Sequence, residues 1–98
     1  MSPKNKKKLL ILRKKLDKVD DRLLSILKIR SNYVKEVLSI KEFKKEIIDR
    51  KRINLILKNI KKKSIKKGID HKISNRIWKN MIYAFIDYEY RNFKKKRK

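Results

Sequence analysis

The sequence predicts an all-α fold of three helices, one long, one short and one of medium length. Three segments place apolar residues at steps of three and four, the spacing that gives a helix one apolar face. The alternation between turn residues that indicates a strand is absent. We therefore expect one small helical domain over residues 9–93, with a basic N-terminal extension (1–8) and a basic disordered tail (94–98).

The first predicted helix covers residues 9–40 and would be about 45 Å long at the usual rise. Its apolar seam alternates steps of four and three, which is typical of a helix that packs along another helix. The seam consists of Leu9, Leu12, Leu16, Val19, Leu23, Ile26, Arg30, Tyr33, Val37 and Ile40. A chain of 98 residues is too small to cover a seam of that length and is only marginally stable as a monomer. We therefore expect a second chain to cover it.

The second and third predicted helices are separated by the single glycine of the chain. Gly68 suits the left-handed residue that ends a helix, and Asp70 suits the cap of the next helix. Before Gly68 the apolar pattern dissolves into a lysine-rich run, so the second helix should be short. We expect His71 to be solvated in the first turn of the third helix. The two faces comprise Ile53, Ile56, Leu57 and Ile60, and then Ile77, Trp78, Met81, Ile82, Phe85, Ile86 and Glu89.

The formal net charge of +23 makes nucleic-acid binding the obvious interpretation. Composition weakens it, because Lys, Ile and Asn supply 47 residues (25, 15 and 7) while Ala, Gly and Pro supply one each. These sets have A/T-rich and G/C-rich codons, so genomic drift alone would add surface lysines. Asp17, Asp20 and Asp21 also break the solvent face of the first helix. A basic helical protein that binds nucleic acid or an anionic surface therefore stays an alternative.

Several classes of site and location are disfavoured by what the sequence lacks. There is no cysteine, and His71 is the only histidine, so we expect no metal and no disulfide. A run of about 18 apolar residues is absent, as is a basic-then-apolar leader. We therefore expect a cytoplasmic protein.

Two ionisable residues, Arg30 and Glu89, lie on stripes that should be buried. A buried charge is costly unless it is paired, so each needs a partner or a ligand. Lys41 follows Arg30 by about three turns on the same face, and the two cations can converge on one anion. Arg13 precedes Arg30 by about 25 Å and could join them only from an antiparallel partner helix. A purely structural explanation is that Arg30 and Glu89 pair with one another or reach the edge of their stripes.

The order of these features resembles a known enzyme family. The segments "LRKKLDKVDDRLLSILKIR", "VKEV", "DRKR" and "RIWKNMIYAFIDYEYRNF" are similar to the all-helical chorismate mutases, including the related isochorismate-pyruvate lyases. The resemblance covers roughly residues 9–93. It implies an intertwined homodimer of three-helix chains, in which the long helix of one subunit completes the active site of the other.

The resemblance also implies roles for individual residues. Arg13 corresponds to the arginine donated across the dimer, and Arg30 and Lys41 to the cations that hold the substrate carboxylates and ether oxygen. Glu89 corresponds to the Gln or Glu that hydrogen-bonds that ether oxygen. Conversion of chorismate to prephenate is a unimolecular rearrangement in which negative charge grows on the ether oxygen. Fixed cations and a donor can catalyse it, and no nucleophile, metal or cofactor is expected.

The sequence departs from the family at two further substrate-binding positions. Lys51 stands where many members have a glutamate that contacts the ring hydroxyl, with Asp49 and Glu46 nearby. Phe85 replaces a small polar residue one turn before Glu89, and the loop after the first helix is short, as in the lyases. We expect a chorismate mutase of aromatic amino-acid biosynthesis, with the salicylate-forming lyase as the alternative.

Overall fold

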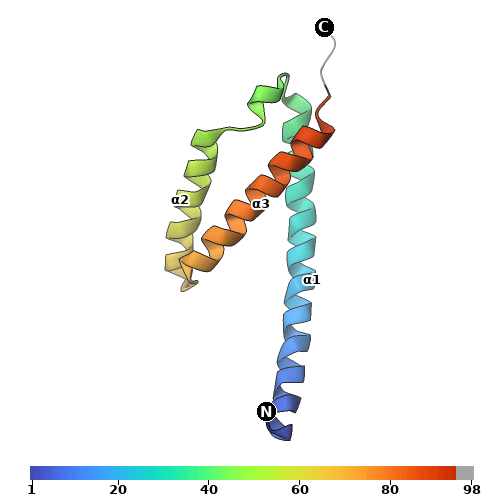
Figure 1. Ribbon diagram of the computed structural model, residues 1–98, viewed down its shortest axis with the longest axis vertical. Helices are drawn as coiled ribbons and strands as arrows, with labels where there is room; N and C mark the ends of the chain where they lie inside the picture. Colours follow the sequence, from blue (N-terminus) through green and yellow to red (C-terminus); the bar gives the residue numbers. More distant parts are fainter. Residues whose placement is uncertain (95–98) are drawn as a thin grey trace. The chain divides into compact units, whose positions relative to one another are not determined.

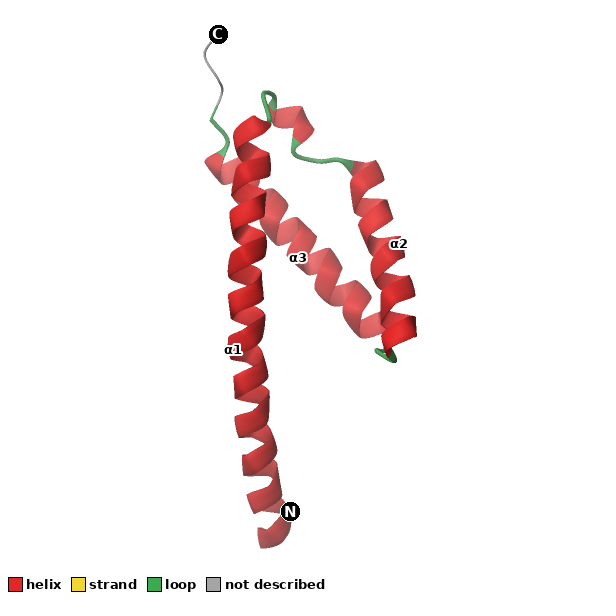
Figure 2. Ribbon diagram, turned by 180° about the vertical axis from the view of Figure 1, so that it is seen from behind, coloured by secondary structure: helices red, strands yellow, loops and turns green. Residues whose placement is uncertain are grey.

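The structure is a computed structural model that describes residues 1–94, so most of the basic tail expected at 94–98 lies outside the described residues. It contains the helices α1 (Pro3–Ile40), α2 (Arg50–Lys67) and α3 (His71–Asn92), and a short 3-10 helix, η1 (Lys44–Glu46) (Figure 1). Residues 1–94 contain no strand (Figure 2). The predicted all-helical fold with three helices is confirmed. The chain divides into two compact units, residues 1–33 and the remainder from Val34.

In the first unit, α1 begins at Pro3, six residues earlier than predicted. Ser2 acts as its cap, because the Oγ accepts from the Asn5 amide at 3.2 Å. Pro3 fits the first helical position, where no amide hydrogen is needed. The basic N-terminal extension expected at residues 1–8 is therefore helical from Pro3 onward, and the 38 residues of α1 span about 57 Å.

The apolar seam of α1 is exposed in the first unit. Its members there, from Leu12 to Ile26, are 45–62% exposed, and α1 contains no buried residue. Each aliphatic side chain left in water forgoes about 1.5–3 kcal/mol of burial free energy. Arg30 differs from these neighbours because it is partly buried. A single chain thus leaves the seam without the cover that its pattern predicts.

The second unit contains a hairpin of α2 and α3. Gly68 has a φ of 73°, and its amide donates to the Ile65 carbonyl at 3.1 Å. The next amide, of Ile69, donates to the Ser64 carbonyl at 2.8 Å, and the two bonds together form a helix end that depends on glycine. Asp70 then caps α3 by accepting from the Lys72 amide at 2.9 Å. Both sequence predictions for this turn are confirmed.

The lysine-rich run before Gly68 lacks an apolar stripe, and α2 nevertheless continues through it to Lys67, next to the predicted stop at Gly68. Lysine is a good helix former, so loss of the apolar stripe does not end the helix. At its other end, α2 is capped by Asp49, whose Oδ1 accepts from the Arg52 amide at 3.0 Å. The run therefore extends α2 rather than forming a loop.

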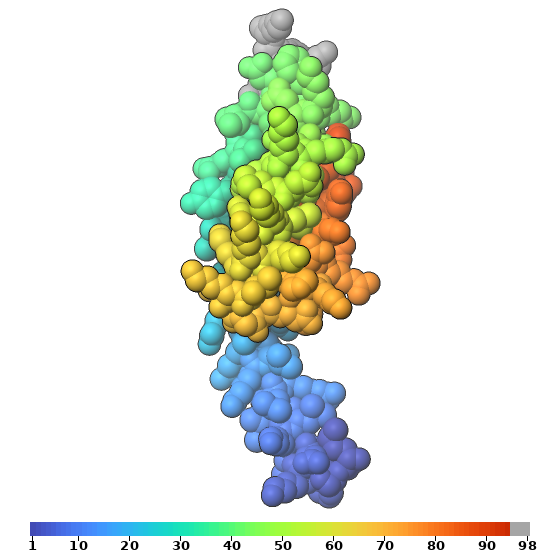
Figure 3. All heavy atoms as spheres, turned by 90° about the vertical axis from the view of Figure 1, so that its left-hand side faces the viewer, coloured from blue at the N-terminus to red at the C-terminus, as the bar shows by residue number. Residues whose placement is uncertain are grey.

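The hairpin is held by a small apolar core and a buried polar contact near its turn. Ile47 and Ile82 are the buried hydrophobic residues of the described chain, at 3% and 5% exposure. Ser64 and Ser74 are also buried, and their hydroxyls lie 2.6 Å apart. Side chains of α2 and α3 meet at this end of the hairpin (Figure 3). The partly buried members are Ile53, Ile56, Leu57, Ile60, Trp78, Met81, Phe85 and Ile86, whereas Ile77 is exposed.

Candidate active site

Lys41 lies at the point where α1 ends. The helix stops at Ile40, and the Lys41 amide still donates to the Leu38 carbonyl at 3.2 Å. Sequence reasoning had placed Lys41 on the same helical face as Arg30. The final bond instead spans three residues, so Lys41 begins the connection to α2 while held by the last turn of α1.

The Lys41 ammonium forms an ion pair with Glu89 of α3. Lys41 Nζ lies 2.8 Å from Glu89 Oε1, and the two side chains are 16% and 7% exposed. A buried carboxylate needs such a charge-assisted bond, because removing a charged group from water costs more free energy than removing a neutral polar group. Sequence reasoning had placed both residues in the site, but it had considered only Arg30 as a structural partner for Glu89.

The connection that carries Lys41 is fixed by local contacts. Glu46 Oε1 accepts from the Phe43 amide at 3.3 Å, and the adjacent Ile47 is buried. Lys44 of η1 lies 6.0 Å from the ring centroid of Tyr90, which joins the connection to the last turn of α3. Glu46 and the helix cap Asp49 are thus both engaged with backbone amides.

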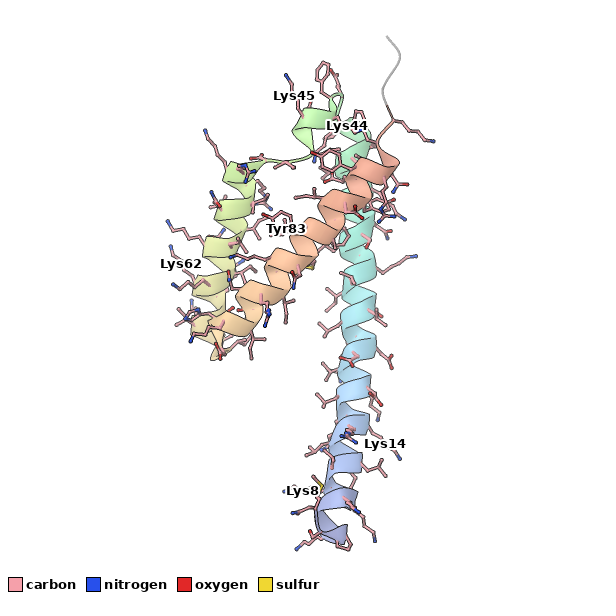
Figure 4. All side chains as sticks on the ribbon, viewed as in Figure 1. Lys8, Lys14, Lys44, Lys45, Lys62 and Tyr83 are labelled. Atoms are coloured by element: carbon pink, nitrogen blue, oxygen red, sulfur yellow. The ribbon has the colours of Figure 1, made fainter. Side chains whose placement is uncertain are left out.

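A groove of about 180 Å³ lies between α2 and α3. Its apolar lining residues are Ile53, Leu57 and Ile82, and its polar lining residues are Arg50, Asn54, Lys79 and Tyr83. Tyr83 projects from the side of α3 that faces α2 (Figure 4). Ile82 and Glu89 share one face of α3, seven residues or about 10 Å apart. The groove therefore begins about two turns of α3 away from the ion pair.

Arg50 lines this groove and is not among the residues that sequence reasoning assigned to the site. Arg50, Ile53, Asn54 and Leu57 follow the i, i+3, i+4, i+7 spacing of one helix face, so Arg50 lines the groove. Lys51 is one position off this face, is exposed, and does not line the groove. The spacing from Ile53 and Leu57 could have distinguished the two cations within the run "DRKR".

The other predicted site residues are distributed over both units. Phe85 is partly buried on α3, one turn before Glu89. Arg30 is partly buried and Arg13 is exposed, and both lie on α1 in the first unit. Lys41 and Glu89 are the pair that the second unit brings together. The roles assigned to these residues stay predictions.

Residues 1–94 hold no group of three His, Cys, Asp or Glu side chains placed to bind a metal ion. Within the same residues, no helix combines the length and the apolar character needed to cross a membrane.

The fold and the ion pair define a small all-helical protein with cations and a buried carboxylate on a helical hairpin. The family model for chorismate mutase type II matches residues 12–90, which is most of the chain. The chain therefore belongs to the all-helical chorismate mutase family. Comparisons with curated proteins and with solved structures gave no match.

Proposed function

We propose that this protein is a chorismate mutase that converts chorismate to prephenate. The observation that carries the proposal is the buried pair of Lys41 and Glu89, 2.8 Å apart, in a chain of the chorismate mutase family. The reaction breaks a carbon–oxygen bond while negative charge grows on the ether oxygen. A preorganised cation beside a hydrogen-bond donor lowers the energy of that transition state.

Each predicted residue has a definite task in this proposal. Arg30 and Lys41 hold the two carboxylates and the ether oxygen, and Glu89 hydrogen-bonds that oxygen. Phe85 packs against the substrate ring from the same face of α3. Arg50 extends the cationic surface into the groove, while Lys51, the next residue along α2, is assigned to the ring hydroxyl because of its position in the family pattern.

The proposal includes a homodimer in which each site receives Arg13 of the partner subunit. The exposed seam supports this arrangement, because an antiparallel α1 from a second chain would cover it. Within one α1, Arg13 and Arg30 are 17 residues, or about 25 Å, apart. A single chain cannot bring both to one small substrate.

Subunit mixing tests the shared site. Arg13→Ala and Arg30→Ala homodimers should each be inactive, and after subunit exchange the mixture should regain about a quarter of wild-type activity. Half of the dimers are then hybrids, and each hybrid has one intact site. Mixing Arg30→Ala with Lys41→Ala is the matched control. In the proposed dimer, Arg30 and Lys41 of each site come from the same subunit, so both sites of this hybrid lack one of the two cations. Recovery in both mixtures, or in neither, would contradict the shared site.

The lyase is a second candidate because two observations favour it. Lys51 replaces the family glutamate, and only nine residues separate α1 from α2. Purified protein should therefore be incubated separately with chorismate and with isochorismate. We expect prephenate from chorismate; salicylate with pyruvate from isochorismate would favour the lyase. The Lys41→Ala protein, purified identically, controls for a contaminating host enzyme, and no conversion of either substrate would sink both candidates.

A further inference from the structure

The outer side of α2 is a one-sign surface that the proposed reaction does not use. The 18 residues of the whole helix include two arginines and seven lysines and no Asp or Glu. Lys58, Lys62 and Lys66 are spaced by four residues, so they form a row along one face, about 6 Å apart. We call these three residues the outer lysine row.

The outer lysine row faces away from the rest of the hairpin. The residues of α2 that meet α3, such as Leu57 and Ser64, lie on the opposite side of the helix. Lys62 extends from the side of α2 turned away from α3 (Figure 4). All three lysines are exposed, and within residues 1–94 none has an acidic partner.

We propose that the outer lysine row binds the phosphate backbone of double-stranded nucleic acid without reading its sequence. A row of cations at a regular spacing matches a row of phosphates, and lysine acts as a point charge rather than as a reader of base edges. Genomic drift accounts for many lysines over the whole chain, but α1 mixes them with Asp17 and Asp21. The absence of acidic residues from all of α2 is the feature that makes a continuous basic surface.

A lipid surface fits this face less well. A helix that lies on a membrane inserts a broad apolar face between the headgroups. On α2 the apolar side chains Ile53 and Leu57 line the groove toward α3, and two large apolar side chains, Leu55 and Ile65, are exposed beside the row, at 49% and 59%. The outer side therefore offers charge for a polyanion and little apolar area for insertion.

The test is a binding titration of the full chain with a fluorescent mixed-sequence DNA duplex at several salt concentrations. The variant carries Lys58→Gln, Lys62→Gln and Lys66→Gln. The matched control carries Lys7→Gln, Lys14→Gln and Lys18→Gln, which removes three cations from the α1 face opposite the seam. Glutamine keeps helix propensity, and circular dichroism should confirm the same helix content in both.

The outer-row variant should bind the duplex at least about tenfold more weakly, and its log–log salt slope should fall by about 2.7, or 0.9 per lost phosphate contact. The control should change its slope by less than about one. Turnover of chorismate should be the same in both, since neither set belongs to the candidate active site. Equal losses in the two triples, binding by wild type that does not respond to salt, or tighter binding to anionic vesicles than to the duplex would overturn the proposal.

Discussion

The hairpin of the second unit and the seam of the first unit differ in how their side chains are satisfied. Around the hairpin, buried polar groups find partners in the same chain, as Glu89 does with Lys41 and Ser64 with Ser74. No buried side-chain nitrogen or oxygen of residues 1–94 lacks a hydrogen-bond partner. Along the seam, by contrast, Leu16 and Leu23 are 60% and 57% exposed. The polar groups of the hairpin are thus paired within one chain, whereas the apolar side chains of the seam stay exposed in one chain.

The largest expected effect comes from breaking the seam. Leu16→Asp with Leu23→Asp should give an inactive monomer, because each carboxylate would be buried without a partner in a dimer. Such a charge costs about 3–5 kcal/mol, so dimer affinity should fall by roughly 10³-fold or more. Sedimentation equilibrium and chorismate turnover measure the two effects. Lys14→Asp with Lys18→Asp, opposite the seam, is the control, and an active monomer of either protein would contradict the shared site.

The next effect should come from the hairpin side of the site. Lys41→Ala and Lys41→Gln should both lower turnover by about 10²–10³, the usual loss when one donor to a developing oxyanion is removed. Only the glutamine can still donate a hydrogen bond to buried Glu89, so it should keep more thermal stability than the alanine variant. Lys35→Ala, an exposed change on α1, should leave both properties unchanged. Turnover near wild type in either Lys41 variant would show that the pocket lies elsewhere.

Most of the helical architecture could be predicted from the sequence because its cues are local. Gly68 and Asp70 define the hairpin turn through backbone conformation and capping, which depend on a few adjacent residues. The start of α1 was missed although Ser2 and Pro3 carry a cap and a first-turn residue, because the charged run after them has no apolar period. The capping signal of Ser2 and Pro3 was present, but the start of the helix was assigned from the first apolar residue of the seam.

The site was predictable in part. Lys41 and Glu89 stood out because of their place on or beside apolar stripes, but their pairing joins residues 48 positions apart and depends on how the connection folds. Arg50 was overlooked beside Lys51, and one helical step of 100° separates the cation that lines the groove from the one that does not. The contact of Ser64 with Ser74 was also missed, since serine carries no apolar pattern that predicts burial.

Glu89 offers a subtler test of the hairpin site through its replacement by glutamine. Donation to the ether oxygen requires a proton on the carboxyl, whereas the ionised form places negative charge against an oxygen that is becoming negative. Glu89→Gln can always donate, and its amide oxygen can still accept from Lys41. It should therefore keep the turnover of the wild type or exceed it.

The control for this test is Glu89→Ala, which should have low turnover because it can neither donate to the substrate nor accept from Lys41. Initial rates should be measured at saturating chorismate, so that changes in substrate binding do not enter the comparison. Turnover of Glu89→Gln as low as that of Glu89→Ala would mean that Glu89 serves as the carboxylate partner of Lys41 and is not the ether-oxygen donor.

The smallest expected effect concerns the buried serines at the closed end of the hairpin. Ser64 Oγ donates to the Ile60 carbonyl at 2.6 Å, so its only hydroxyl proton is used there and Ser74 must donate across the helices. Ser74→Ala should therefore lower the free energy of unfolding by about 1 kcal/mol, or roughly 5 °C in Tm, with turnover unchanged. Ser64→Ala should cost a similar amount, because Ser74 can turn only to the more distant His71 carbonyl at 3.4 Å. The double variant should cost less than the sum of the two, because neither serine then leaves the other without its partner. Thermal and urea unfolding of the four proteins gives this comparison, and strictly additive losses would show that the two hydroxyls do not act as one hydrogen-bonded pair.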